Sequence, residues 1–351
     1  MNTLTKLFGV VLLGAFQLII CQYVHAQDLK QAGGYMNFIS HEYRGIMENY
    51  MSYTSAVAHG KSARKVDNKR QALLKSVKEV TQKVSSMPAF EGDKSLRDST
   101  VTFLKITYHI LTDDYGKIID LEEIAEQSYD AMEAYYLAQD AAGEKLEEAH
   151  QRLKETEKKF AEAHNVNLIT NDDELSKKLE IASKVNKYHR TIYLIFFKSY
   201  KQEAYLLEAI NNKNINSIEQ NKNTLASFAQ EGLDKLAKQS AYNGDNSLIA
   251  ACKQLLEFHK AACKDKINIM TNYYLKEENF NKIKKAFDTK KESERTQADV
   301  DEYNKAVNEL NKAVEEFNST NIALNDSRNK IIDNWNKTSQ SFLNKHTPKH
   351  K

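Results

Sequence analysis

Along most of this chain the apolar residues recur at intervals of three and four positions, the spacing that places side chains on one face of an α-helix. Between residues 62 and 86, for example, Val66, Leu73, Val77 and Val80 follow this spacing. Such patterns predict helices over residues 35–58, 62–86, 96–132, 145–166, 174–211, 217–239, 247–290 and 296–344. Gly143 is expected to mark the corner between the third and fourth. The predicted fold class is therefore all-α.

The last of these segments has the most regular pattern. Its apolar residues follow a three-four heptad and are Val300, Tyr303, Val307, Leu310, Val314, Phe317, Leu324, Ile331, Trp335 and Phe342. Polar residues Asn321, Arg328 and Thr338 occupy the remaining positions of the seam. A sustained repeat of 3.5 residues predicts a coiled-coil-like seam. We expect its first part to lie in a bundle core, and its more polar far end to project toward a partner.

Two short segments in the two halves of the chain are closely similar. Residues 89–96 read AFEGDKSL and residues 241–248 read AYNGDNSL. At the same shift of 152, apolar Leu73 and Leu104 fall on Leu225 and Leu256. A shift of 150 aligns the segments before them, and a shift of 157 aligns the segments after them. This collinearity indicates an internal tandem duplication with changes of length in the loops. It predicts two four-helix-bundle-like units of long antiparallel helices, residues 27–170 and 174–344, which join near residues 171–173.

Composition agrees with long helices and limits the range of partners. The chain has 351 residues, of which only 2 are proline and 28% are charged. Its formal net charge is only +2, whereas a dedicated nucleic-acid-binding protein carries a strong basic excess. After the N-terminal segment, no stretch approaches the about 20 apolar residues that a membrane-spanning helix needs. We therefore expect neither nucleic-acid binding nor a transmembrane span in the mature chain.

The N-terminus has the pattern of an export signal. Lys6 precedes an apolar run over residues 7–21, and Val24-His25-Ala26 forms a small-residue cleavage site before Gln27. Residues 1–26 are thus predicted to be a signal peptide, which indicates a periplasmic, secreted or surface location. A lipoprotein signal that lipidates Cys21 at the outer membrane is the alternative, although Ile20 is large for the position before such a cysteine.

Three residues of the seventh helix lie on one face and raise the question of a metal site. Cys252, His259 and Cys263 are spaced by seven and four positions. They align with Thr100, Thr107 and Leu111 in the first half, which are not a ligand set, so a core position is the favoured interpretation and a metal-binding helical bundle the alternative. We predict no cofactor. We also find no nucleotide-binding loop, nucleophile elbow or Cys/His dyad, and therefore predict that the chain is not an enzyme.

A cluster of basic residues lies at the predicted start of the second helix. It consists of Lys61, Arg64, Lys65, Lys69 and Arg70, beside His59. Cations in the first turn oppose the helix dipole, and a bound anion would relieve this. The cluster is thus a candidate ligand-binding site for a lipid phosphate, a phosphorylated glycan or an acidic partner, and a solvated helix face is the alternative. The basic tail, residues 345–351, is expected to be disordered.

Three segments carry a resemblance to a known group of proteins. They are YTSAVAHGKSARKV at residues 53–66, AFEGDKSLRDS at residues 89–99, and DNWNK at residues 333–337. With these, the chain resembles a family of exported, all-helical surface proteins of Gram-negative bacteria whose function is uncharacterised. The resemblance implies export and a surface or periplasmic location, and no activity or site.

The function expected from these observations is that of an exported, non-catalytic interaction or structural protein of the bacterial cell envelope. Its expected partner is a protein or another envelope component. Binding of an anionic lipid or glycan at the basic cluster is the first alternative, and a metal-binding helical bundle is the second.

Overall fold

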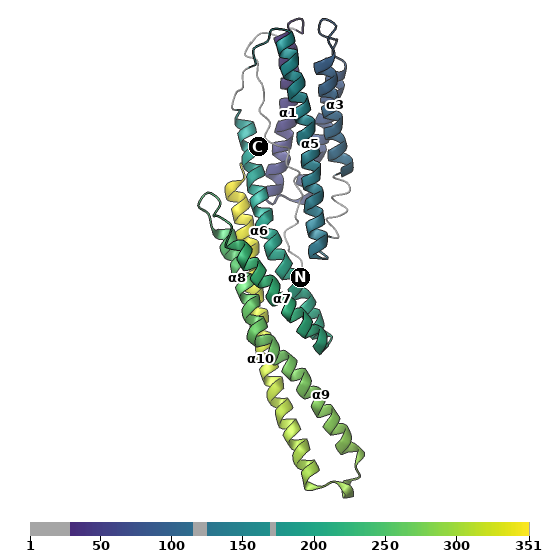
Figure 1. The fold of residues 1–351 in the computed structure, drawn as a ribbon, viewed down its shortest axis with the longest axis vertical. Helices are drawn as coiled ribbons and strands as arrows, with labels where there is room; N and C mark the ends of the chain where they lie inside the picture. Colours follow the sequence, from purple (N-terminus) through teal and green to yellow (C-terminus); the bar gives the residue numbers. More distant parts are fainter. Residues whose placement is uncertain (1–28, 115–124, 169–172, 351) are drawn as a thin grey trace. The chain divides into compact units, whose positions relative to one another are not determined.

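The computed structural model describes residues 29–114, 125–168 and 173–350, and its regular elements in these ranges are helices (Figure 1). The α-helices are α1 Ala32–Ala58, α2 Ala63–Ser85, α3 Ser95–His109, α5 Tyr129–Ala163, α6 Glu174–Asn211, α7 Ile215–Leu236, α8 Ser247–Ala261, α9 Ile267–Thr289 and α10 Gln297–His346. Short π-helical turns follow α3 and α8, namely η1 Ile110–Asp114 and η2 Ala262–Lys266, and a 3-10 turn, η3 Glu292–Glu294, precedes α10. The all-α class is confirmed. The predicted signal peptide, residues 1–26, lies outside the described residues.

The predicted third and fourth helices are wrong in their boundaries. α3 and η1 together end at Asp114, and Met132 belongs to α5, which runs without interruption through Gly143. α5 begins at Tyr129 because the Ser128 hydroxyl accepts a hydrogen bond from the Ala131 amide, as an N-cap does. A glycine inside a helix costs only about 1 kcal/mol, which the buried face of α5 offsets.

Contacts divide the chain into two compact units that do not coincide with the predicted repeat units. Of the described residues, unit 1 contains those up to Arg190 and those from Ser339 onward, and unit 2 comprises residues 191–338. The difference arises because α6 and α10 are continuous helices, each of which contributes residues to both units.

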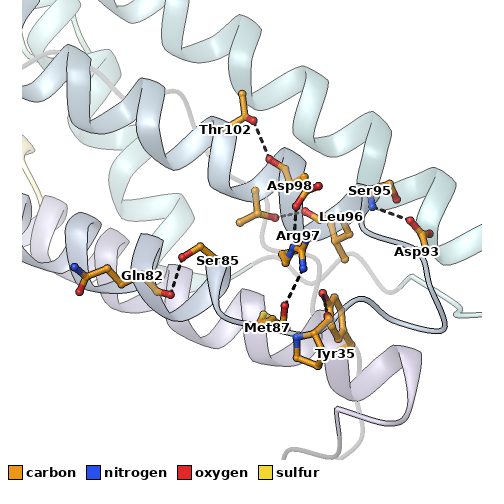
Figure 2. A network of polar contacts seen from close by, with 12 residues as sticks. Tyr35, Gln82, Ser85, Met87, Asp93, Ser95, Leu96, Arg97, Asp98 and Thr102 are labelled. Atoms are coloured by element: carbon orange, nitrogen blue, oxygen red, sulfur yellow. Dashed lines mark hydrogen bonds and ion pairs between the residues drawn. The ribbon is translucent and has the colours of Figure 1, made fainter.

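In unit 1, α1 packs on α2, α2 on α3, and α3 on α5. The Tyr35 ring of α1 also stacks on Phe160 of α5, with ring centroids 5.8 Å apart. The connection from α2 to α3 is fixed by polar contacts (Figure 2). The Tyr35 hydroxyl donates to the Pro88 carbonyl at 3.0 Å, and Arg97 donates to the Met87 carbonyl at 3.0 Å. These bonds satisfy two backbone carbonyls of the loop that follows α2.

The two similar octapeptides form the same turn. Phe90 and Asp93 exchange two backbone hydrogen bonds, and so do Tyr242 and Asp245. The two residues between each pair have positive φ, 51° and 90° at Glu91 and Gly92, and 49° and 81° at Asn243 and Gly244. Each turn leads into a helix of 15 residues, α3 or α8, which a five-residue π-turn follows.

Unit 2 is built on closely packed helices. Gly232 of α7 leaves space for Leu256 of α8, and a Cβ atom at Gly232 would lie 2.9 Å from the Leu256 Cδ1. Trp335 of α10 stacks on Phe196 of α6 with ring centroids 4.0 Å apart. α9 and α10 continue as an antiparallel helical hairpin that η3 closes, as seen at the lower end of Figure 1.

The expectation for the last helix is reversed by the structure. Trp335 and Phe342 are each only 1% exposed, whereas Val300, Tyr303 and Val307 near the start of α10 are half-buried. The tail predicted to be disordered is packed in unit 1 as far as His350. Thr347 is buried, and the His350 amide donates to the Ser55 hydroxyl at 3.2 Å.

Candidate functional site

A chain of buried polar side chains crosses unit 2. Ser199 and Glu203 lie one turn apart on α6, His259 lies on α8 and Arg328 on α10. The Ser199 hydroxyl is 2.7 Å from the His259 Nδ1. The Glu203 Oε1 accepts from the Arg328 Nε at 2.8 Å, and the Arg328 Nη1 donates to Asn325 at 2.5 Å. The cluster thus links three helices through their inner faces.

The central contact of this cluster lies between Glu203 and His259. The His259 Nε2 lies 3.2 Å from the Glu203 Oε2, but the direction departs from that of a good hydrogen bond. Burial favours a raised pKa at Glu203, and the contacts with His259 and Arg328 outweigh this, so the pKa of the carboxyl lies below its ordinary value. Glu203 is therefore charged at neutral pH, which a buried carboxylate sustains only when it is paired.

Serine, histidine and glutamate in contact suggest a hydrolytic triad, and the burial argues against this. Ser199 and His259 are each 0% exposed. A nucleophile must reach its substrate, and here the hydroxyl is enclosed by helices. We therefore interpret the cluster as a structural one that fixes α6, α8 and α10 against one another.

A cavity of about 230 Å³ lies beside this cluster. Its walls come from α6, α7, α9, α10 and the π-turn η2, all within unit 2. Most of the lining is apolar, with Leu206 and Ile210 from α6, Leu225 from α7, and Met270 from α9. Its polar lining consists of Glu203, Asn211, Asn321, Asn325 and Arg328. Asn321 and Arg328 are two of the polar residues that interrupt the seam of α10.

The cysteines are buried thiols. Cys252 is 0% exposed and Cys263 is 5% exposed, and both are free. Burial raises the pKa of Cys263 to about 12 and that of Cys252 further, so neither is a thiolate at neutral pH. The core interpretation of these two residues and of His259 is confirmed by their burial. Within the described ranges, no three His, Cys, Asp or Glu side chains are grouped so that they could hold a metal ion.

The basic cluster predicted to bind an anion lies in unit 1. Lys61, Arg64, Lys65 and Lys69 are exposed around the start of α2. The first turn of α2 contains no acidic residue, and the side chain of its N-cap Ser62 makes no capping hydrogen bond.

The other two residues of this cluster are engaged elsewhere in unit 1. The His59 Nδ1 is 3.0 Å from the Asn344 Oδ1, and Arg70 donates to the Leu111 carbonyl of η1 at 3.5 Å. The structure therefore places four cations together at the helix start and directs two of the predicted residues to other helices.

Comparisons with known proteins do not assign this chain to a family. No family model matches the chain, and no curated protein or solved structure is found to be similar to it. The chain is shown to be an all-helical protein, and its resemblance to exported surface proteins stays a prediction. In the part of the chain that the structure describes, no helix combines the length and apolar character needed to cross a membrane.

Proposed function

We propose that this chain is an exported, non-catalytic interaction protein of the bacterial cell envelope, and that the distal part of the α9–α10 hairpin is its binding surface. We call residues 275–289 of α9 and 297–314 of α10, with the turn between them, the distal hairpin. The signal-like pattern of residues 1–26 supports export.

The observation that carries the proposal is the incomplete burial of the seam in the distal hairpin. No α9 residue after Tyr274 is buried in the described structure, and the first buried residue of α10 is Ala306. Apolar side chains of the seam remain half-buried, namely Phe280, Ile283, Phe287, Val300, Tyr303, Val307 and Leu310. Two helices cover only part of an apolar seam, and a third or fourth helix completes the burial in stable bundles.

The tip of the hairpin is nevertheless well ordered by its own contacts. Phe287 stacks on Tyr303 with ring centroids 4.8 Å apart, and the Arg295 guanidinium lies 4.3 Å from the Phe287 ring centroid. Lys276 and Glu309 pair across the two helices at 2.6 Å. A surface that is already organised loses little conformational entropy when a partner binds.

Photo-crosslinking in cells tests this proposal. A photoreactive residue would replace exposed Leu275 of α9, and in a separate variant Leu137 of α5, which is an exposed leucine outside the hairpin. We expect a discrete crosslinked product from position 275 and none from position 137. Products of equal yield at both positions, or none at either, would contradict the hairpin as the binding surface.

A second candidate function is anion binding at the start of α2. The specific observation in its favour is that α2 begins with exposed Arg64 and Lys65 and with no acidic residue or side-chain cap. Changing Lys61, Arg64 and Lys65 to glutamine should abolish binding to vesicles that contain anionic phospholipid. Unchanged sedimentation with these vesicles would exclude this function.

We also propose that the two halves of the chain descend from one duplicated helical unit. The equal turns at Glu91-Gly92 and Asn243-Gly244 support this, as do the equal lengths of α3 and α8 and the π-turn that follows each. An inserted residue is a common origin of a π-turn, and its presence at the same place in both halves fits a shared ancestor.

A further inference from the structure

We propose that the cavity of unit 2 is a binding site for a small monocarboxylate with an apolar tail. This goes beyond the proposed function, because the cavity lies among α6, α7, α9, α10 and η2 and none of its lining residues belongs to the distal hairpin. The site joins an apolar pocket to a group of hydrogen-bond donors.

The apolar part sets the size of the ligand. A cavity of about 230 Å³ is larger than the roughly 150 Å³ that an apolar cavity needs to hold benzene. Leu206, Ile210, Leu225 and Met270 are each at most 6% exposed, and they form an apolar wall around it. A chain of about six carbons or a single ring fits this volume.

The polar part sets the chemistry. Arg328 has five N–H groups, of which one donates to Glu203 and one to Asn325. Three therefore have no partner among the described residues. The Asn325 Nδ2 donates to the Asn321 Oδ1 at 3.2 Å, which leaves the Asn321 Nδ2 available as a donor. Arg328 and Asn321 thus both offer hydrogen-bond donors on this wall.

The Glu203 carboxylate occupies only one of the Arg328 N–H groups, and its charge is partly neutralised by that pairing. The Glu203 Oε1 already accepts a hydrogen bond from Arg328, and the Oε2 lies 3.2 Å from the His259 Nε2. Arg328 can pair with two carboxylates at once because its planar guanidinium presents a second edge. A ligand carboxylate at this edge would place its tail toward Leu206 and Met270.

Features of α10 and of the π-turn η2 meet at this cavity. Asn321 and Arg328 occupy seam positions of α10 where the other heptads carry apolar residues. Ala262, at the first position of the π-turn η2, is a small residue on the same cavity. π-turns inside helices are frequent at functional sites because they shift side chains out of the regular register.

Calorimetric titration of the whole protein with three probes tests the proposal. The probes are hexanoate, hexan-1-ol and hexylamine, which share a tail and differ in the head group. We expect hexanoate to bind with one-to-one stoichiometry, and the alcohol at least about tenfold more weakly, because a charge-assisted hydrogen bond contributes about 1.5–3 kcal/mol. Fluorescence of Trp335, the single tryptophan, provides a second signal two turns from Arg328.

Two variants and one control locate the site. Arg328→Met should weaken hexanoate binding by about tenfold or more, and Ala262→Met should abolish it by filling the cavity while the protein keeps its helicity. Arg152→Met removes an exposed arginine of α5 in unit 1 and should leave binding unchanged. If Arg328→Met does not fold, the loss or retention of hexanoate binding by Ala262→Met decides whether the cavity is the site.

Several results would overturn the proposal. They are the absence of binding by all three probes, equal binding of hexanoate and hexan-1-ol, preference for hexylamine, and full hexanoate binding by Ala262→Met. Because the crosslinking test of the hairpin uses Leu275, its failure would leave these titrations unaffected, and the two proposals can fail separately.

Discussion

Arg328 shows how one polar residue changes the environment of a helix. At a seam position, a long charged side chain would be costly to bury alone, and Arg328 is retained there because Glu203 pairs with it. Glu203 in turn requires His259, whose other nitrogen meets Ser199. The cluster is therefore a set of mutually dependent residues. The removal of one charged member is expected to cost more than the removal of a whole pair.

His189 predicts how stability depends on pH. It is buried in unit 1, its Nε2 is 2.7 Å from the Ser339 hydroxyl, and burial lowers its pKa from 6.5 to about 4. Between these values the unfolded chain binds a proton that the folded chain does not. The free energy of unfolding should therefore fall as the pH decreases through this window, with a contribution on the order of 3 kcal/mol.

Urea unfolding at pH 7.5 and pH 4.5 measures this effect. His189→Gln should reduce the difference between the two pH values, whereas the exposed His41→Gln should not. His150, whose pKa is lowered by burial and secondarily by Lys154 to about 3, acts in the same direction, so a part of the slope should remain. An unchanged slope in His189→Gln would contradict the assignment.

At the same scale, the sequence allowed only half of the site to be predicted. Asn321 and Arg328 were recognisable as polar residues in a seam, and His259 as a core residue. Their partners were not recognisable, because Ser199 and Glu203 lie on another helix and no local pattern states which helices face each other. A charged residue at a seam position was the available signal that a buried partner exists.

At the scale of helices, the packing of α7 on α8 depends on Gly232. Leu256 is 0% exposed, and a Cβ atom at Gly232 would lie 2.9 Å from its Cδ1 and 3.2 Å from the Ile195 Cγ2. Gly232→Ala should therefore destabilise by up to about 2 kcal/mol, since overpacking exceeds the gain of about 1 kcal/mol in helix propensity.

In a double-mutant cycle with Leu256→Ala, the effect of Gly232→Ala on stability should change sign. Leu256→Ala alone should cost about 2–5 kcal/mol, as should the equally buried Leu104→Ala in unit 1. In the Leu256→Ala background, Gly232→Ala should become stabilising by about 1 kcal/mol, because the clash is gone and the new methyl group occupies part of the void. Additive effects in thermal or urea unfolding would mean that Gly232 does not limit the packing.

The two equal turns predict that exchanging their first residues, Glu91 and Asn243, changes stability in opposite directions. Positive φ at the first turn residue suits asparagine better than glutamate, and the second half has Asn243 where the first has Glu91. Glu91→Asn should stabilise the protein by about 0.5–1 kcal/mol, and Asn243→Glu should destabilise it by a similar amount. Changes of the same sign in urea unfolding would show that the turns are not equivalent.

Long regular helices were predictable and their ends less so. α6 was predicted over residues 174–211 and has these bounds, because a continuous apolar face fixes a helix of this length. Gly143 misled the prediction, since a glycine is only a weak breaker when both flanks pack. The Ser128 cap was a readable signal for the start of α5. The turns at Gly92 and Gly244 were also predictable, because glycine is favoured where φ is positive.

For the whole molecule, the division into units could not be predicted from the repeat. A repeat in sequence indicates which segments are alike, whereas compactness depends on which helices touch. α6 and α10 are long enough to take part in two cores, so the boundary falls inside them at residues 190 and 338. Similarity between two segments of sequence therefore does not determine which helices form one compact unit.

Export stays a prediction for the whole chain, and its test concerns the N-terminus. We expect the protein in an envelope fraction to begin at Gln27 without lipid, because Val24-His25-Ala26 has the small residues that a signal peptidase requires. Intact mass and N-terminal sequencing of the full-length product measure this. Cys21→Ser should leave the mature mass unchanged, whereas Ala26→Arg should block cleavage and leave the precursor.

The alternative outcome has a different physical meaning. A mass increase from acyl chains at Cys21, lost in Cys21→Ser, would show a lipoprotein, since each buried methylene contributes about 0.8 kcal/mol to membrane attachment. The distal hairpin would then act from a membrane anchor, where a weak contact is strengthened by high local concentration. A soluble product starting at Gln27 requires the hairpin to hold its partner by contact area alone. Its half-buried seam should then include the residues that dominate the affinity, with Phe280 and Tyr303 foremost because aromatic anchors contribute most at interfaces.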